Sequence, residues 1–396
     1  MILAWQVISR TLASYLADFA PEDALVVNGS EPLALVNLAD EQLNALIPPQ
    51  PAVPAGQFAK DALLQDPLNA RALRILGQLA DYAKDDMRAK SLMALAARYS
   101  LRESVATAWM AHESYETKDY PRAIYYSDVL LRTRPNFAAS VMPLFGHLAE
   151  TKEASGELKR LLRTNPPWRP YFFATLPNSV TDARTPLDIL LSVRDSANPP
   201  SNAELRPYLL ALMSHKLYDL AYYTWLQFLP PEELGSAGLL FNGSFDVVPS
   251  GLPFDWVITQ GSGVTIDMVR MPEQDHGRAL FIDFQYGRVE YHSVTQMIML
   301  APANYQFTAK YKGELIGPRG LKWRIICGGA TATLLGESQM IIGKADGWKE
   351  ISFNFTVPQG NCRPQIVSLD LDARMASEQL ITGPVWFENM QIARSE

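Results

Sequence analysis

Apolar residues follow two different periods in the two halves of the chain. Over roughly the first 230 residues they recur every three or four positions, as on one face of an α-helix. At the amino end, Trp5, Ile8, Leu12, Tyr15 and Phe19 form such a series. After the segment FLPPEELGSAG the period falls to two, which is typical of strands with one buried face. The pattern therefore predicts a helical part followed by a β part.

A self-repeat organises the helical part. Three series of positions are each spaced 34 residues apart: Ala55, Ala89 and Ala123; Ala62, Ala96 and Leu130; and Pro67, Leu101 and Pro135. A repeat of this length indicates helix pairs that stack on their neighbours, because neither helix of a pair can bury its apolar face alone. The clearest units are 70–103 and 104–137, and a weaker unit covers 36–69.

The segment KDYPRAIYYSDVLLRTRPN carries the most specific part of the repeat. Tyr120 lies at the turn within the unit, Ala123 is where two helices can approach closely, and Pro135 ends the second helix. This pattern resembles the tetratricopeptide repeat. The resemblance implies an α-solenoid over residues 36–232, preceded by a helical segment at 1–35, with a concave groove that docks a protein partner.

The second half predicts an antiparallel β-sandwich of the jelly-roll kind over residues 239–396. Its strand-like segments are RALFIDFQYG, QMIMLAP, YQFTAKYKG, LKWRIICGG, EISFNFTVP, QIVSLDLDA and VWFENMQIA. Glycine and proline separate these segments, and no helical pattern lies between them. The complete chain is therefore expected to be a multidomain α + β protein.

The segment LLFNGSFDVVPSGLPFDW begins this β part. It resembles the opening of jelly-roll carbohydrate-binding modules, which have a galactose-binding-like fold. The later segments QMIMLAPANYQFTAKYKGE, GWKEISFNFTVP and VWFENMQI resemble further strands of such modules, in the same order. The resemblance implies the fold and suggests a glycan ligand, although this fold serves sugar binding, protein docking and structural roles alike.

The resemblance also implies a structural calcium ion. Asp246 follows the opening motif and Glu388 lies on the last predicted strand, the two places where such modules hold the ion. Carboxylate oxygens suit calcium. Aspartate stands at position 246 where the family more often has glutamate, and the alternative is a solvated carboxylate pair without metal.

Sugar recognition requires flat apolar faces for the pyranose ring and nearby planar polar groups for its hydroxyls. The expected glycan-binding residues are Trp256, Tyr286, Gln296, Arg324 and Trp348. The three aromatic residues lie near predicted turns, and the two polar ones lie on alternate strand positions. Trp323 shares its strand parity with Leu321 and Ile325, so we expect it in the core. The alternative to a glycan site is an ordinary hydrated sheet face.

The chain has two cysteines, Cys327 and Cys362, both at the ends of predicted strands. One interpretation is a disulfide, which requires an oxidising compartment such as the periplasm. The other is a pair of buried thiols in a cytosolic protein. The sequence leaves both open.

Composition and motifs exclude several classes of function. The formal net charge of −7 and the absence of a basic block argue against nucleic-acid binding. The five histidines form no metal-binding spacing, and neither a phosphate-binding glycine loop nor a nucleophile elbow occurs. The sequence therefore predicts a protein that is not an enzyme and has no cofactor other than the possible calcium ion.

No apolar run is long enough to span a membrane. One interpretation is that an export signal or an anchoring helix lies upstream of Met1, so that membrane contact occurs only through that segment. The other is that the chain starts with a helix packed on the domain behind it.

Together these patterns lead to a functional hypothesis. Helical repeats beside a carbohydrate-binding-like domain resemble accessory proteins of bacterial exopolysaccharide assembly or export. We therefore expect a non-enzymatic adaptor of the periplasm or cell envelope that contacts a protein partner and a polysaccharide. The alternatives are a pure protein scaffold of a membrane assembly, and a polysaccharide-modifying enzyme that uses a strand carboxylate such as Glu290.

Overall fold

The computed structural model describes residues 2–44, 53–235, 237–271, 277–328, 332–360 and 362–395. The chain divides into two compact units, Met1–Asn198 and Pro199–Glu396. The first unit is helical, and the second combines three helices with two β-sheets. The helical and antiparallel β parts expected from the sequence are thereby confirmed, while the sequence-based domain limits at 36, 232 and 239 stay predictions.

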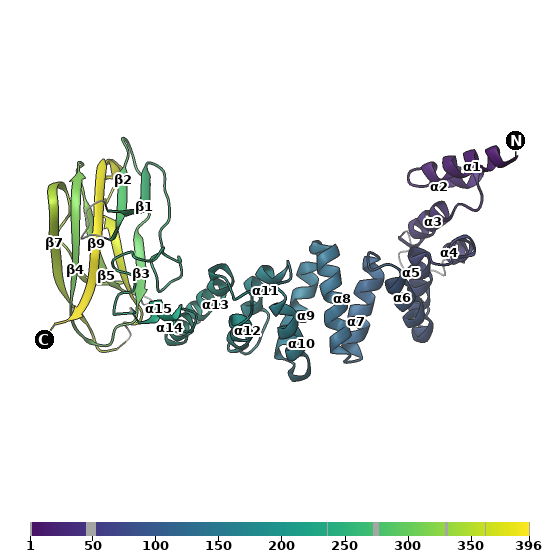
Figure 1. Cartoon of the computed structure of the whole chain (residues 1–396), viewed down its shortest axis with the longest axis horizontal. Coiled ribbons are helices and arrows are strands. Elements are labelled where there is room, and N and C mark those ends of the chain that lie inside the picture. Colours follow the sequence, from purple (N-terminus) through teal and green to yellow (C-terminus); the bar gives the residue numbers. More distant parts are fainter. Residues whose placement is uncertain are drawn as a thin grey trace. The chain divides into compact units, whose positions relative to one another are not determined.

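The described elements of the first unit are α1 (Ile2–Leu16), α2 (Pro21–Val27), α3 (Pro32–Asn44), α4 (Val53–Gln65), α5 (Ala70–Tyr82), α6 (Asp86–Tyr99), α7 (Ser104–Glu116), α8 (Tyr120–Thr133), η1 (Pro135–Phe137), α9 (Ala138–Glu150), α10 (Lys152–Arg163), α11 (Arg169–Thr175), η2 (Leu176–Asn178) and α12 (Thr185–Arg194). Helices α1 to α10 pack on the helices next to them in sequence, whereas α12 packs on α9 and α10 (Figure 1). The arrangement is consistent with a helical repeat.

The 34-residue interval reappears in the turns of this unit. Lys84 and Lys118 both have φ of 60°, the left-handed conformation that ends many helices. Directly after them, Asp85 and Asp119 cap the following helices, because their side chains accept hydrogen bonds from backbone N–H groups three residues on. A third left-handed lysine, Lys216, precedes α14 of the second unit. The 34-residue period therefore applies to the turns before α6 and α8 as well as to the packing of the helices.

Small residues set the distance between these helices. Ala55, Ala89 and Ala123 are all fully buried. A Cβ atom placed on Gly77 would lie 3.0 Å from Cγ of Met93, so α5 and α6 are in close contact at this point. The predicted units at 70–103 and 104–137 begin where α5 and α7 begin, whereas α3 starts at Pro32, four residues before the predicted start of the weaker unit.

The first helix packs through a different face from the one that its apolar pattern indicates. Ala13 and Ala17 are fully buried, in a cluster with Ala24 and Ala34. The expected apolar series is exposed instead: Trp5 by 69%, Ile8 by 58%, Leu12 by 45%, Tyr15 by 71% and Phe19 by 62%. Alanines allow the closer approach between helices, so within this unit they form the contact.

The second unit begins with α13 (Asn202–Ser214), α14 (Tyr218–Gln227) and α15 (Pro231–Leu234). Two sheets follow, with strand orders β1-β2-β9-β4-β7 and β3-β8-β5-β6 and antiparallel pairing throughout the described ladders. The strands are β1 (Val264–Arg270), β2 (Arg278–Phe284), β3 (Val294–Ile298), β4 (Ala303–Leu315), β5 (Leu321–Cys327), β6 (Thr333–Glu337), β7 (Gly343–Val357), β8 (Gln365–Leu371) and β9 (Gly383–Arg394). A short η3 (Ala376–Gln379) precedes β9.

One core fills the space between the two sheets and makes them a sandwich. Trp323 lies at its centre and is fully buried, as its strand parity predicts. Its ring centroid is 5.3 Å from that of Phe307, 5.6 Å from that of Phe387 and 5.9 Å from that of Trp256. The contacts with Phe307 and Phe387 join β5 of one sheet to β4 and β9 of the other.

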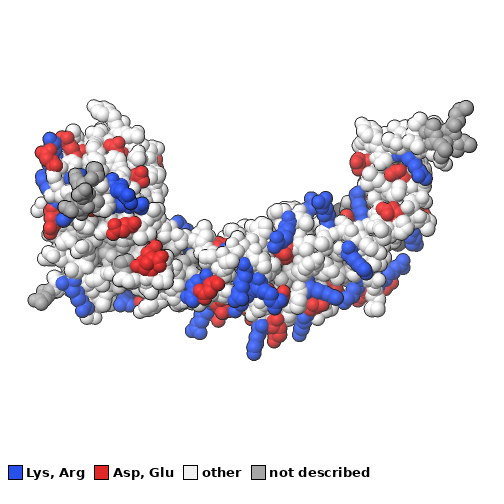
Figure 2. All heavy atoms as spheres, viewed as in Figure 1, with Lys and Arg blue, Asp and Glu red and all other residues white. Residues whose placement is uncertain are grey.

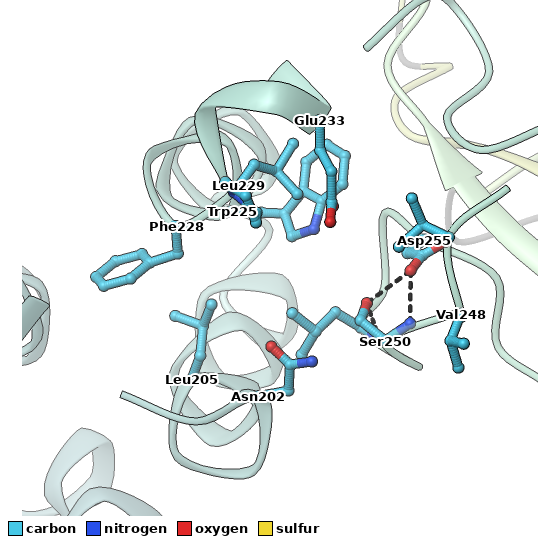
Figure 3. Close-up of a pocket in the computed structure, with 12 residues that line it drawn as sticks. Asn202, Leu205, Trp225, Phe228, Leu229, Glu233, Val248, Ser250 and Asp255 are labelled. Atoms are coloured by element: carbon cyan, nitrogen blue, oxygen red, sulfur yellow. Dashed lines mark hydrogen bonds between the residues drawn. The ribbon is translucent and has the colours of Figure 1, made fainter. Parts of the chain in front are cut away.

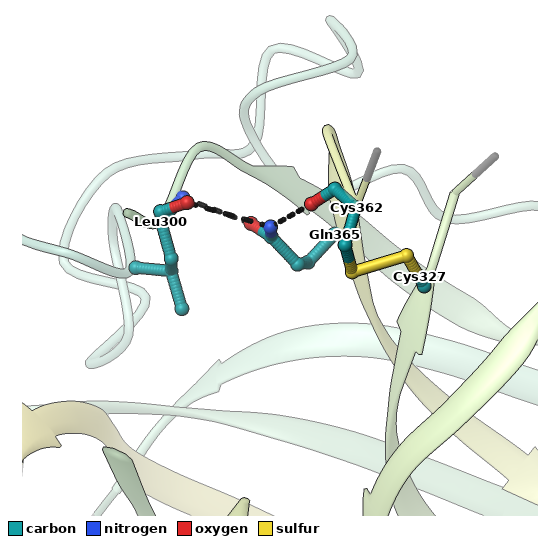
Figure 4. The surroundings of a disulfide bond; sticks show 4 residues. All are labelled: Leu300, Cys327, Cys362 and Gln365. Carbon is teal, nitrogen blue, oxygen red and sulfur yellow. Dashed lines mark hydrogen bonds between the residues drawn. A yellow bond between two sulfur atoms is a disulfide. The ribbon is translucent and has the colours of Figure 1, made fainter. Parts of the chain in front are cut away.

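A disulfide joins Cys327, at the end of β5, to Cys362 ahead of β8, with the two Cα atoms 5.2 Å apart (Figure 4). Beside it, the buried amide side chain of Gln365 accepts a hydrogen bond of 2.8 Å from the backbone N–H of Leu300 and donates to the carbonyl of Cys362. The crosslink closes a loop of 35 residues and constrains the unfolded chain.

An aromatic cluster attaches α14 to the segment that leads into the sandwich. The ring centroid of Trp225 lies 5.1 Å from that of Phe241 and 5.7 Å from that of Phe254. At the other end of α14, Asp219 pairs with Arg363 at 3.0 Å. These contacts explain why α13–α15 belong to the same compact unit as the sheets.

A search of the described residues for a helix long and apolar enough to cross a membrane finds none.

The left-handed lysines provide a test of the repeat geometry. Lys118→Gly should raise the free energy of unfolding by roughly 0.5–1 kcal/mol, because glycine adopts positive φ without the steric cost that a side chain carries. Chemical denaturation of the complete chain measures the change. Lys60→Gly, at an exposed position inside α4, is the matched control and should lower the free energy of unfolding by about 1 kcal/mol. Destabilisation by both variants would contradict the turn assignment.

Candidate functional site

Two aromatic side chains stack on the outer face of the five-stranded sheet. Phe281 of β2 lies directly opposite Trp386 of β9 in the strand register. Their ring centroids are 4.9 Å apart and their planes are inclined by 32°. Both side chains are half-buried, so each ring is partly open to solvent.

The same face continues onto the next two strands of the sheet. Lys312 of β4 lies opposite Trp386, and its Nζ is 4.9 Å from the ring centroid of the half-buried Trp348 of β7. This distance is within the range of a cation–π contact. Four adjacent strands, β2, β9, β4 and β7, thus contribute to one line of side chains, which we call the aromatic row: Phe281, Trp386, Lys312 and Trp348.

Charged and polar groups flank the aromatic row. Asp267 of β1 lies opposite Phe281, and Asp283 is two positions further along β2, on the same face as Phe281. Lys310 of β4 lies opposite Glu350 of β7 on one side and opposite Glu388 of β9 on the other. Rings with neighbouring carboxylates and ammonium groups can hold a ligand that has apolar faces and hydroxyl edges.

Strand alternation explains why these rings point outward. Leu280 and Ile282, on either side of Phe281, are fully buried in the core. Val385 and Phe387, on either side of Trp386, are 1% and 0% exposed. Because successive side chains of a strand point to opposite faces, the residues between them must lie on the outer face.

Two of the residues predicted to bind glycan are core residues in this structure. Trp256 is fully buried, and its indole N–H donates a 2.9 Å hydrogen bond to the carbonyl of Asn242. Gln296 is 1% exposed and shares the inward parity of Val294, and its amide exchanges two hydrogen bonds with the backbone of Phe241. Both side chains are held by hydrogen bonds to the segment that precedes β1.

The other three predicted residues lie in separate places. Tyr286 is fully exposed in the bend after β2. Arg324 lies on β5, in the four-stranded sheet, and only Trp348 belongs to the aromatic row. The expected set therefore does not form one site.

Sequence reasoning did not select Phe281 and Trp386 as binding residues, although a signal for them existed. In RALFIDF, Phe281 has the parity of Asp283, and in VWFENM, Trp386 has the parity of Glu388. An aromatic residue that shares the parity of a carboxylate on an amphipathic strand is expected on the polar face.

Arg324 is the centre of an ion-pair network. Its guanidinium donates to Glu337 at 3.1 Å, to Asp370 at 3.4 Å and to Asp372. Lys322 adds a 2.8 Å hydrogen bond to Glu337. Each nitrogen atom of the guanidinium thus has a carboxylate partner, which fixes the side chain on the four-stranded sheet.

This network shifts the pKa values of its carboxyls. The hydrogen bond from Lys322 lowers the pKa of Glu337, and Arg324 lowers it further against the opposing effect of burial. Burial raises the pKa of Asp372, but the hydrogen bond from Arg324 and the charges of Lys322 and Arg324 outweigh it and leave that pKa lowered. The same carboxylates raise the pKa of Arg324.

The two residues expected to bind calcium lie on segments that run side by side. The hydroxyl of Ser244 donates to the side-chain oxygen of Asn389 at 3.2 Å, and the N–H of Met390 donates to the carbonyl of Gly243 at 2.9 Å. Asp246 is exposed and Glu388 is 3% exposed. Within the part of the chain that the structure describes, no group of three or more acidic, histidine or cysteine side chains could hold a metal. The calcium ion stays a prediction.

Comparisons with known proteins place the chain in no family. No family model matches it, and no curated protein matches it. Several solved structures similar to part of the chain are carbohydrate-binding modules, and the similarity lies in the β part.

A CBM4 module is 20% identical, with a TM-score of 0.30, over 39% of this chain and 99% of that chain. A family 16 carbohydrate-binding module is 14% identical, with a TM-score of 0.28, over 40% and 100%. The CBM22-2 xylan-binding domain from Paenibacillus barcinonensis is 12% identical, with a TM-score of 0.27, over 39% and 98%. All three TM-scores are below 0.5.

The lowered carboxyl pKa values predict an acid-dependent contribution to stability. In the folded protein, the pKa values of Glu337 and Asp372 lie below the ordinary values of 4.5 and 3.8. In the acidic range, the unfolded chain therefore binds more protons than the folded protein does. The stabilisation is present above these ordinary values and is lost as the pH falls through the lower, folded ones. Arg324→Met should therefore lower the free energy of unfolding at neutral pH, and the difference from wild type should shrink below about pH 4.

Urea unfolding across this pH range measures the effect. Arg394→Met, at an exposed position of β9, is the matched control and should lie close to wild type at every pH. A difference between Arg324→Met and wild type that is independent of pH would show that the network does not shift these pKa values.

Proposed function

We propose that this protein is a non-enzymatic adaptor of the cell envelope, in which the sandwich binds a polysaccharide and the helical unit docks a protein partner. The observation that carries the glycan role is the aromatic row. Phe281, Trp386 and Trp348 are half-buried aromatic residues on the outer face of a single sheet, and the rings of the first two contact each other at an inclined angle. Their flat faces suit the apolar faces of pyranose rings.

The geometry of the row favours an extended ligand. It crosses four adjacent strands, which are spaced about 4.8 Å apart. A glycan chain laid across these strands would meet successive rings, and Asp267, Asp283 and Lys310 could hydrogen-bond to its hydroxyls. A single monosaccharide would engage only part of the row.

The charge distribution supports a neutral or weakly charged ligand. Figure 2 shows lysine and arginine side chains interspersed with aspartate and glutamate on the face in view, without a continuous basic patch there. Together with the net charge of −7, this distribution does not favour a nucleic acid as a partner.

The disulfide supports a place outside the cytosol. Bonds such as Cys327–Cys362 form and persist in oxidising compartments, among them the bacterial periplasm. A periplasmic protein that binds a glycan chain through one unit and a protein through the other would act in the assembly or export of an exopolysaccharide. This role follows from the resemblance of the repeats and the sandwich to accessory proteins of that pathway.

Substitutions in the aromatic row test the glycan role. Trp386→Ala should weaken binding to a polysaccharide roughly tenfold or more, because it removes the ring at the middle of the row. Trp386→Phe keeps a flat face and should retain most of the affinity. Titration calorimetry of the complete chain against a panel of bacterial polysaccharides measures binding.

Tyr286→Ala is the matched control, since Tyr286 is a fully exposed aromatic residue off the row. It should bind as tightly as wild type. The glycan role is refuted if no polysaccharide of the panel binds, or if Trp386→Ala binds as tightly as the wild-type protein.

A groove in the helical unit favours the second candidate function, a protein scaffold. It has a volume of about 380 Å³ and lies between α7, α8 and α9. Ala111, Leu130, Val141 and Leu144 contribute apolar walls. Ser127 also lines it, and its hydroxyl is fully buried with no hydrogen-bond partner among the described residues. An apolar side chain and a backbone amide from a bound segment would fit these walls and this hydroxyl.

Site-specific photocrosslinking from position 140 tests protein docking. Ser140 is exposed and lines the groove, whereas the next residue back, Ala139, is equally exposed and lies outside the lining. A photoreactive residue at position 140 should crosslink to one defined protein in the native cell, because a docked segment would lie against it. The same probe at position 139 should give little of this product. Equal yields from both positions would argue against binding in the groove.

A further inference from the structure

A pocket of about 200 Å³ lies within the second unit, between its helices and the segment that leads into the sandwich (Figure 3). Leu205 of α13, Leu229 after α14 and Leu252 of the segment provide apolar walls. The indole of Trp225 and the two carboxyls of Glu233 and Asp255 also line it. The aromatic row has no residue in this lining, so the pocket is a separate feature of the unit.

The indole N–H of Trp225 is a buried donor that the described part of the chain leaves unsatisfied. The residue is 2% exposed, and its Nε1 has no hydrogen-bond partner among the described residues. Figure 3 shows this nitrogen turned toward the space between α14 and the segment around Asp255. Packing against Phe241 and Phe254 holds the ring in this orientation. A buried donor without an acceptor costs free energy, and a ligand oxygen in the pocket would remove that cost.

The two carboxyls give the pocket a negative field. Asp255 is 2% exposed, and its oxygens accept hydrogen bonds from the N–H and hydroxyl of Ser250, at 2.6 and 2.8 Å, and from the N–H of Trp256 at 2.7 Å. Glu233 lies on the opposite wall, on α15. Asp255 therefore contributes mainly its charge, and Glu233 adds a second carboxyl to the lining.

The local electrostatics favour a positively charged ligand. Burial raises the pKa of Glu233, and the negative charges of Asp255 and Glu232 raise it further. Burial also raises the pKa of Asp255, despite the hydrogen bonds that lower it. None of the described residues that line the pocket is a lysine, arginine or histidine. Arg206 lies against Gly251 beside the pocket, outside this lining.

We propose that this pocket binds a small ligand that carries a protonated primary amine beside a hydroxyl oxygen, such as an amino sugar or a simple amino alcohol. The ammonium group donates to Glu233 within the field of Asp255, and the hydroxyl oxygen accepts from the indole N–H of Trp225. The volume is below the roughly 300–1,000 Å³ that drug-sized ligands occupy, which limits the ligand to about the size of one monosaccharide.

The inference is independent of the polysaccharide role proposed for the sheet face. It requires a soluble small molecule, and its residues differ from those of the aromatic row. Loss of polysaccharide binding in a Trp386 variant would therefore leave it intact, and failure of the small ligand to bind would leave the proposed function intact.

Indole N–H signals in an NMR spectrum provide a direct test. The chain has eight tryptophans, and comparison with Trp225→Phe identifies the signal of Trp225. The complete protein is titrated with glucosamine, glucose and N-acetylglucosamine, which differ only in the group at C2, and with ethanolamine. Concentrations up to about 50 mM cover the weak affinity expected of such small ligands.

We expect a saturable shift of the Trp225 signal with glucosamine and no shift with glucose or N-acetylglucosamine. If ethanolamine also binds, the site recognises the amine and hydroxyl alone; if only glucosamine binds, it also recognises the sugar ring. Equal effects of all three sugars, or none with either amine, would overturn the proposal.

Two variants complete the test. Glu233→Gln preserves shape and removes the charge, and should weaken glucosamine binding about tenfold or more. Glu232→Gln is the matched control, because Glu232 is exposed on the same helix and outside the pocket lining, and it should bind nearly as well as wild type. Thermal unfolding shows whether each variant is folded. A folded Glu233→Gln protein that binds glucosamine with unchanged affinity would refute the role of the carboxylate.

Discussion

The second unit depends on the alternation of its strands around a tryptophan-centred core. Trp323 contacts Phe307 and Phe387 of the opposite sheet, and the core around these three residues includes the buried side of the neighbouring strands. Once Leu280 and Phe387 point inward, Phe281 and Trp386 must point outward. The candidate binding face is therefore a consequence of the core, because a shift of one residue in register would exchange the two sets of side chains.

In the helical unit, the corresponding constraint is the close approach of neighbouring helices. Fully buried alanines recur at the 34-residue interval, and left-handed lysines with aspartate caps recur in the turns. Small residues set the spacing and the turns set the direction in which each helix begins. A groove lies between α7, α8 and α9 of this unit.

Trp225 connects packing and binding. Its ring holds α14 against Phe241 and Phe254, which requires burial, and burial is what makes its indole N–H costly without an acceptor. Asp255 is also buried, which is unfavourable for a carboxylate, and hydrogen bonds from Ser250 and Trp256 offset part of this cost. Burial of a polar group costs free energy unless the group is hydrogen-bonded. A ligand in the adjacent pocket can supply such a hydrogen bond.

The sequence by itself determined the helical and β parts, the 34-residue units that begin at Ala70 and Ser104, and the core position of Trp323, because these depend on local periodicity. The tertiary structure alone decided that Trp256 is buried, that α1 packs through its alanines, and that α13–α15 join the sheets. Trp256 lies in an irregular segment, where no alternation indicates which way a side chain points. Contacts between residues far apart in sequence settle such positions, and a periodic pattern contains no information about them.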